Sequence, residues 1–132
     1  MNKEELISIA IEARKRSYSP YSHFAVGAAL YCMDGSVYIG ANIENSSFPV
    51  SMCAERNAIY NAMMDGKSSE DFLALAVVAD TSSFCSPCGA CRQVLSELYP
   101  NDKPIYLANL KGDVKVTNIE ELLPFSFDGS DL

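Results

Sequence analysis

Hydrophobic residues recur at helical spacing in three parts of the chain. At the start, Asn2 and Glu5 resemble a helix-capping pair, and the residues that then share one helical face are Leu6, Ile9, Ala10 and Ala13. Helical spacing returns over residues 53–66 and 88–100. We therefore expect three helices, followed by a short terminal helix over residues 119–124.

Shorter apolar runs between these segments predict strands. The expected strands are residues 24–32, 37–44, 72–79, 104–110 and, as a short edge strand, 114–118. The first two flank Asp34 and Gly35, a strong hairpin signal, so we expect them to pair antiparallel. The third, "FLALAVVA", is apolar at every position, as in a strand covered on both faces.

The order of these elements predicts an α/β layered fold with a mixed sheet, because helices alternate with strands after the first hairpin. A chain of 132 residues with 48% hydrophobic content has the length of one domain, residues 1–132, with one substantial core. We see no signal peptide and no run long and apolar enough to span a bilayer, and therefore expect a cytoplasmic protein. The net charge of −7 argues against long nucleic acids as partners.

Five cysteines stand out in this composition. Cys85, Cys88 and Cys91 lie at every third position, and Cys53 comes directly before an expected helix. Because cytoplasmic thiols are kept reduced and the count is odd, a metal or catalytic role is favoured over a structural disulfide. Helix N-termini favour thiolates, so two such ends facing one another would form a site for cysteine ligands. The sole histidine, His23, is in no metal-spaced motif.

One pattern among the cysteines matches the signature of zinc deaminases. Cys53 is followed after one residue by Glu55, and Cys88 and Cys91 form a C-x-x-C preceded by proline. Three thiolates fill three zinc positions, water takes the fourth, and the unligated Glu55 can accept a proton from that water. We interpret Cys85 and Cys32 as buried hydrophobic residues or loop thiols.

Other interpretations of the thiols remain open from the spacing alone. Four cysteines could hold an iron–sulfur cluster, but this leaves Glu55 without a purpose. In addition, the proline here precedes the middle cysteine, whereas in the ferredoxin motif it follows the last one. A closed four-cysteine structural zinc site and a thioredoxin-like redox pair are further alternatives.

At this point the chain resembles the small homotetrameric cytidine deaminases. The similarity runs through nearly the whole chain, in the blocks "YSPYSHFAVGAAL", "GANIENSSFP", "CAERNAI", "SPCGACRQVLSEL" and "EELLPFSF". It implies a three-layer α/β/α fold around a five-stranded mixed sheet and one Zn²⁺ per subunit. It also implies conversion of cytidine and deoxycytidine to uridine and deoxyuridine with loss of ammonia, a step of pyrimidine salvage.

The resemblance assigns roles to individual residues. It makes Cys53, Cys88 and Cys91 the zinc ligands and Glu55 the proton shuttle. The substrate-binding residues that it implies are Phe24 on the pyrimidine, Asn42 and Glu44 at the ribose 3′-hydroxyl, the main chain of Ala54 and Ser86 at the base edge, and Phe127 from a neighbouring subunit. Phe48 stands where the family has tyrosine, which removes a hydroxyl.

A role for Arg56 at the zinc site follows from charge and helix geometry. Three thiolates around Zn²⁺ carry a formal charge of −1, which weakens zinc as a Lewis acid. Arg56 lies three residues after Cys53 on one helix, so its guanidinium can donate hydrogen bonds to the ligand sulfur and withdraw charge. We therefore expect Arg56 to tune the zinc site.

Glu44 bears on the choice of substrate, because a carboxylate repels a nearby phosphate while accepting a hydrogen bond from a sugar hydroxyl. Free nucleosides are therefore favoured over nucleotides. An alternative is deamination of a blasticidin-type nucleoside antibiotic, whose enzymes share the zinc site but lack the "NIEN" stretch. A non-catalytic zinc protein that acts through assembly is a third possibility, against which the presence of Glu55 argues.

Overall fold

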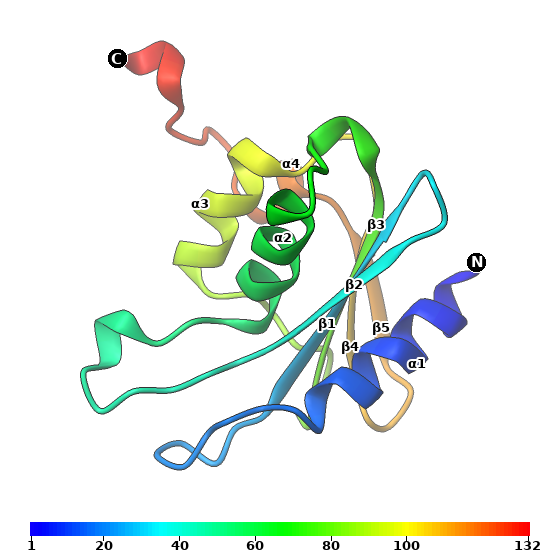
Figure 1. The fold of residues 1–132 in the computed structure, drawn as a ribbon, viewed down its shortest axis with the longest axis vertical. Coiled ribbons are helices and arrows are strands. Elements are labelled where there is room, and N and C mark those ends of the chain that lie inside the picture. Colours follow the sequence, from blue (N-terminus) through cyan, green and yellow to red (C-terminus); the bar gives the residue numbers. More distant parts are fainter.

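Five strands form one mixed sheet at the centre of the molecule (Figure 1). The computed structural model describes residues 1–132, apart from the side chain at position 131. The strands are β1 (Val26–Cys32), β2 (Val37–Ala41), β3 (Phe72–Ala79), β4 (Ile105–Asn109) and β5 (Val114–Thr117). They are arranged in the order β2-β1-β3-β4-β5, and only β3 and β4 pair in parallel. The predicted mixed sheet, its antiparallel hairpin and its short edge strand are confirmed.

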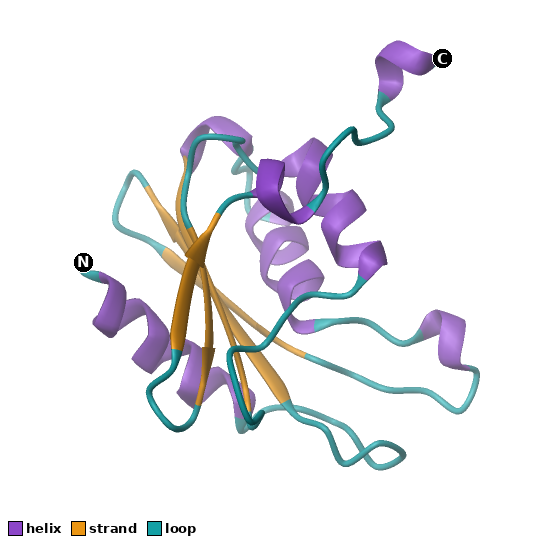
Figure 2. Ribbon diagram, turned by 180° about the vertical axis from the view of Figure 1, so that it is seen from behind, coloured by secondary structure: helices purple, strands orange, loops and turns teal.

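Helices cover both faces of this sheet. Helix α1 (Lys3–Arg14) lies on one face, while α2 (Ala54–Met64), α3 (Gly89–Leu98) and the short α4 (Ile119–Leu122) lie on the other (Figures 1 and 2). This confirms the three-layer α/β/α arrangement. No helix in the described part of the chain is long and apolar enough to cross a membrane.

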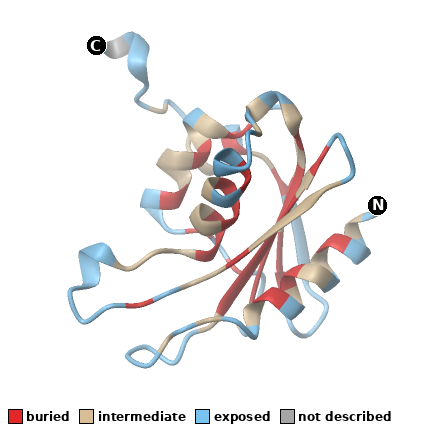
Figure 3. Ribbon diagram, viewed as in Figure 1, coloured by how far each residue is buried: buried red, intermediate tan, exposed pale blue. Residues whose placement is uncertain are grey.

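Strand β3 shows how one sequence supplies two cores. Leu75 and Val77 face the larger core with α2 and α3, whereas Ala76 and Val78 face the core with α1. Every residue of β3 except Leu73 is buried, and β3 with its neighbours β1 and β4 forms the most buried part of the sheet (Figure 3). The continuous apolar run therefore reflects burial on both faces, as predicted.

The first hairpin is shorter than its sequence pattern predicted. Phe24 was expected inside the first strand, but it precedes β1 and is 42% exposed. The amide of Asn42, just after β2, takes over the pairing: its Oδ1 accepts from the backbone N–H of Val26 at 2.9 Å and its Nδ2 donates to the carbonyl of Phe24 at 2.7 Å. This side chain ends the regular ladder at the edge of the site.

Two glycines allow helices to sit directly on the sheet. A Cβ at Gly27 in β1 would lie 2.1 Å from the carbonyl oxygen of Ala10 in α1. A Cβ at Gly40 in β2 would lie 2.2 Å from the carbonyl oxygen of Ala54, in the first turn of α2. The start of α2 is therefore held against the sheet at a separation that only glycine permits.

Candidate active site

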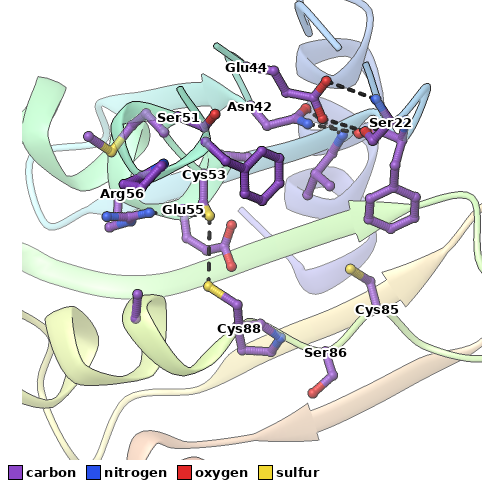
Figure 4. Close-up of a pocket in the computed structure, with 18 residues that line it drawn as sticks. Ser22, Asn42, Glu44, Ser51, Cys53, Glu55, Arg56, Cys85, Ser86 and Cys88 are labelled. Carbon is purple, nitrogen blue, oxygen red and sulfur yellow. Dashed lines mark hydrogen bonds between the residues drawn. The ribbon is translucent and has the colours of Figure 1, made fainter. Parts of the chain in front are cut away.

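The starts of α2 and α3 face one another and bring three thiols together. Cys53 is the N-cap of α2, Cys88 is the N-cap of α3, and Cys91 lies in the first turn of α3. The Sγ atoms of Cys53 and Cys88 are 3.8 Å apart (Figure 4), and those of Cys88 and Cys91 are 3.5 Å apart. Because helix N-termini favour negative charge, the start of α2 favours the thiolate form of Cys53.

The spacing of these sulfurs fits a zinc ion. Thiolate ligands about 2.3 Å from a tetrahedral Zn²⁺ lie about 3.8 Å from one another. All three Sγ atoms lie within 4.8 Å of one another, so the donors can hold zinc with little movement. A hydrogen bond with Cys91, aided by the guanidinium of Arg56, lowers the pKa of the Cys53 thiol below its ordinary value. The metal-binding form of this thiol is thereby favoured.

The other two cysteines lie apart from this group. Cys32 is fully buried in β1, within the larger core. Cys85 is also buried, and loss of solvation raises the pKa of its thiol to about 11. Among the described residues, the cluster with metal-binding geometry contains three cysteines and no fourth, which counts against a four-thiol centre.

Glu55 lies beside the thiols without joining them. Its side chain is only 4% exposed, and burial raises the pKa of its carboxyl group. Figure 4 shows the carboxylate directed toward the space between Cys53 and Cys88. A buried carboxyl group whose pKa is raised holds a proton more readily than an exposed one, which suits a group that accepts a proton and returns it.

Arg56 contacts the thiol cluster from the side. Its Nη2 donates a hydrogen bond to Sγ of Cys53 at 3.4 Å. Its Nε is buried and has no hydrogen-bond partner within the described part of the chain. The guanidinium is thus turned toward the sulfur rather than toward solvent, which is the contact expected for a side chain that withdraws charge from a thiolate.

A cavity of about 490 Å³ opens above the cysteines. This volume falls within the usual range of small-molecule sites. The assigned residues that line it are Phe24, Asn42, Glu44, Cys53, Ala54, Glu55, Arg56, Ser86 and Cys88. Phe48 lines it too, from the short 3₁₀ helix η1 (Phe48–Val50). The structure thus gathers residues separated by more than 60 positions in the sequence around one cavity.

Glu44 lies at the far end of this cavity and also holds a loop. Its Oε1 accepts from the backbone N–H groups of Tyr21 and Ser22, both at 3.1 Å, and its Oε2 accepts from the hydroxyl of Ser22. The hydrogen bonds from Ser22 lower the pKa of Glu44, so the group is an ionised acceptor. The same hydroxyl of Ser22 accepts from the N–H of Phe24 at 3.0 Å. The sequence pattern did not reveal this support for Phe24.

Phe127 lies outside the cavity of its own chain. The segment after α4 leads away from the sheet (Figures 1 and 2), and Phe127 is 57% exposed on it. Its carbonyl oxygen accepts a hydrogen bond from Nε2 of Gln93 at 3.1 Å. A role for Phe127 in substrate binding therefore requires a second copy of the chain.

Comparison with known proteins agrees with this site. Residues 1–107 match the family described as "Cytidine and deoxycytidylate deaminase zinc-binding region". The cytidine deaminase of Sporosarcina psychrophila is 52% identical over 132 residues, covering 100% of this chain and 96% of the relative. The cytidine deaminase of Halalkalibacterium halodurans is 51% identical over 132 residues, covering 100% of this chain and 98% of the relative.

Solved structures show the same similarity. The crystal structure of cytidine deaminase from Burkholderia pseudomallei superposes with a TM-score of 0.94 at 46% identity, covering 96% of this chain and 100% of that chain. The enzyme from Mycobacterium tuberculosis superposes with a TM-score of 0.82 at 35% identity, covering 97% of this chain and 98% of that chain.

Proposed function

This chain belongs to the cytidine and deoxycytidylate deaminase family, and we propose that residues 1–132 act as one catalytic domain that deaminates cytidine and deoxycytidine. The products are uridine or deoxyuridine and ammonia. The observation that carries the proposal is the group of three sulfurs at zinc spacing on a nucleoside-sized cavity, beside the buried and unligated Glu55.

Cys53, Cys88 and Cys91 would hold the zinc, and the ion supplies a water whose pKa is lowered to near neutrality. Glu55 would accept one of the two protons of that water as the oxygen of the water adds to C4 of the base. The same carboxyl group passes that proton to N3, then takes the proton of the new C4 hydroxyl and delivers it to the amino group, which leaves as ammonia when the C4–N bond breaks. One side chain serves both steps because it is not committed to the metal.

The remaining cavity residues bind and orient the nucleoside. Phe24 packs on the pyrimidine, and the main chain at Ala54 and Ser86 reads the edge of the base. Asn42 and Glu44 bind the 3′-hydroxyl of the sugar; the ionised Glu44 accepts a hydrogen bond there and repels a phosphate. We therefore propose that free nucleosides are preferred to nucleotides.

We further propose that the active unit is a cytoplasmic homotetramer that functions in pyrimidine salvage. Support comes from Phe127, which is exposed and does not line the cavity of its own chain. In the tetramer this ring would complete a neighbour's site. Sedimentation velocity of the active protein tests this: a fully active monomer would contradict it, and Phe127→Ala should weaken nucleoside binding while zinc is retained.

Substrate assays with metal analysis test the function directly. Cytidine, deoxycytidine and cytidine monophosphate are supplied separately to purified protein, the loss of cytosine absorbance is followed, and bound zinc is measured on the same sample. We expect turnover of both nucleosides and much slower turnover of the monophosphate. A blasticidin-type nucleoside is supplied in a fourth assay. Zinc-loaded protein that deaminates neither cytidine nor deoxycytidine would overturn the proposal.

A further inference from the structure

Arg92 makes an unusually complete set of hydrogen bonds close to the zinc ligands. It follows Cys91 directly in α3, and its side chain is half-buried. Its Nε donates to the carbonyl of Pro87 at 3.0 Å, its Nη2 to the hydroxyl of Ser86 at 2.7 Å, and its Nη1 to the carbonyl of Leu122 at 2.7 Å. All three guanidinium nitrogens therefore bind protein oxygen atoms.

Two of these acceptors lie in the loop that leads into the site. Within the described residues, no other side chain donates a hydrogen bond to Ser86 or Pro87. The preceding anchor of this loop is the N–H of Cys85, which donates to the carbonyl of Ala108 in β4 at 3.3 Å. Between that anchor and the N-cap Cys88, the loop is held by the guanidinium of Arg92.

The chemistry of arginine suits this task. A planar guanidinium can donate in three directions at once, and bonds from a charged donor are stronger than those between neutral groups. The described residues contain no salt bridge that involves Arg92. Its donors are therefore used on carbonyl and hydroxyl oxygens, and neither lysine nor glutamine could reach all three acceptors from one position.

We infer that Arg92 is a positioning residue. It holds the loop at Ser86 and Pro87 in the place from which the main chain contacts the edge of the base. This inference rests on the proposed function, in which Ser86 contacts the pyrimidine. A loop displaced by about 1 Å can lose much of an oriented contact. Arg92 does not touch the nucleoside itself, since it does not line the cavity.

The third bond of Arg92 extends this support to the C-terminal segment. Leu122 is the last residue of α4, from which the segment bearing Phe127 begins. The next residue of α3, Gln93, donates to the carbonyl of Phe127. Arg92 thus contacts the loop and the root of the segment, whereas Gln93 contacts the segment alone. This difference separates the two effects experimentally.

The test compares Arg92→Gln and Arg92→Lys with two control variants. Gln93→Ala removes a bond to the C-terminal segment only. Tyr99→Phe removes a hydrogen bond of 2.6 Å from the Tyr99 hydroxyl to the carbonyl of Pro104, at the opposite end of α3. Each variant is assayed for zinc content, thermal unfolding, KM and kcat for deoxycytidine, and Kd for uridine by calorimetry.

For Arg92→Gln we expect about one zinc per chain, and KM and the uridine Kd raised together by about 10-fold or more, with kcat much less affected. Arg92→Lys should be intermediate and provides the measurement if the glutamine variant does not fold. Tyr99→Phe should lower stability without raising KM, and Gln93→Ala should raise KM less than Arg92→Gln.

Four results would overturn the positioning role. These are an unchanged KM and uridine Kd in both Arg92 variants, loss of zinc as their main defect, an equal rise of KM in Tyr99→Phe, or reproduction of the whole effect by Gln93→Ala. A wild-type protein that does not deaminate deoxycytidine would instead overturn the proposed function, so the two failures are distinguishable.

Discussion

The guanidinium of Arg56 and the thiol of Cys53 are joined by a hydrogen bond of 3.4 Å across the first turn of α2. Three thiolates around a divalent ion leave one excess negative charge, and a cationic donor on one sulfur offsets part of it. Through this contact, Arg56 can change the charge on the thiolate ligands without itself binding metal or substrate.

Arg56→Gln should retain some zinc and lower kcat/KM for cytidine by roughly 10- to 100-fold, because the ligand sulfur then carries more of its charge. Arg56→Lys should recover part of the loss. Steady-state kinetics over a range of pH, with competitive zinc titration, measures the effect. Wild-type activity with an unchanged pH profile and unchanged zinc affinity would show that Arg56 does not tune the site.

Glu55→Gln should keep about one zinc per chain and an intact fold while losing nearly all turnover. The amide preserves the shape of the buried side chain but cannot carry a proton between the water and the base. Metal analysis, thermal unfolding and a sensitive ammonia assay on the same preparation separate these effects. Substantial residual turnover of cytidine would remove Glu55 from the mechanism.

Cys85→Ala should bind zinc as the wild-type protein does, whereas Cys53→Ala should lose it. Burial raises the pKa of the Cys85 thiol to about 11, so this thiol is protonated at neutral pH, and it lies outside the three-sulfur group. The metal content of both variants, measured after dialysis, decides whether Cys85 or Cys53 is the zinc ligand. The opposite pattern would mean that the third ligand is misassigned.

Gly40→Ala and Gly27→Ala form a matched pair on opposite faces of the sheet. Each added methyl group would meet a helix backbone at close to 2 Å, at Ala54 or Ala10 respectively, so each should cost about 1–3 kcal/mol of stability. Only Gly40→Ala displaces the start of α2, next to Cys53. It alone should also lower zinc affinity and activity.

Thermal unfolding and zinc titration of both glycine variants check this expectation. If both bind zinc with wild-type affinity, close seating of α2 on the sheet is not what places Cys53. Equal losses of zinc affinity would instead point to a general loosening of the fold.

Asp34→Asn should reveal a stabilisation that depends on pH. Nζ of Lys67 lies 2.8 Å from the Asp34 carboxylate, and this bond lowers the pKa of Asp34 in the folded protein. The stabilisation is complete above the ordinary aspartate pKa of about 3.9 and is lost as the pH falls through the lowered folded value. The difference in Tm between wild type and variant should therefore narrow below about pH 4. A difference that is the same at pH 3 and pH 7 would contradict this assignment.

The sequence predicted well those features that depend on near neighbours. Strand β3 was recognised over its full length because burial on both faces makes every position apolar. The contact between Arg56 and Cys53 followed from their separation of three residues on one helix. These relations need only the period of the helix or strand, which the sequence contains.

Contacts between distant segments were not predictable in the same way. The role of Arg92 has no sequence signature, because Leu122, one of its acceptors, lies 30 residues away and its other acceptors carry no charge. Asn42 and Glu44 were assigned to the substrate, but their bonds to the segment around Phe24 became visible only when the fold joined the two. Polar residues that serve the backbone leave no periodic pattern.

Two parts of the cavity lining differ in how freely they can change. Cys53 and Ala54 are tied to the seating of α2 on the sheet. The short helix η1, in contrast, contributes Phe48 and contains no buried residue. Substitutions in η1 can therefore alter the shape of the cavity with little penalty to folding. In directed evolution toward bulkier nucleoside analogues, the first tolerated substitutions should therefore fall in this short helix, since changes there leave Cys53 and Ala54 in place.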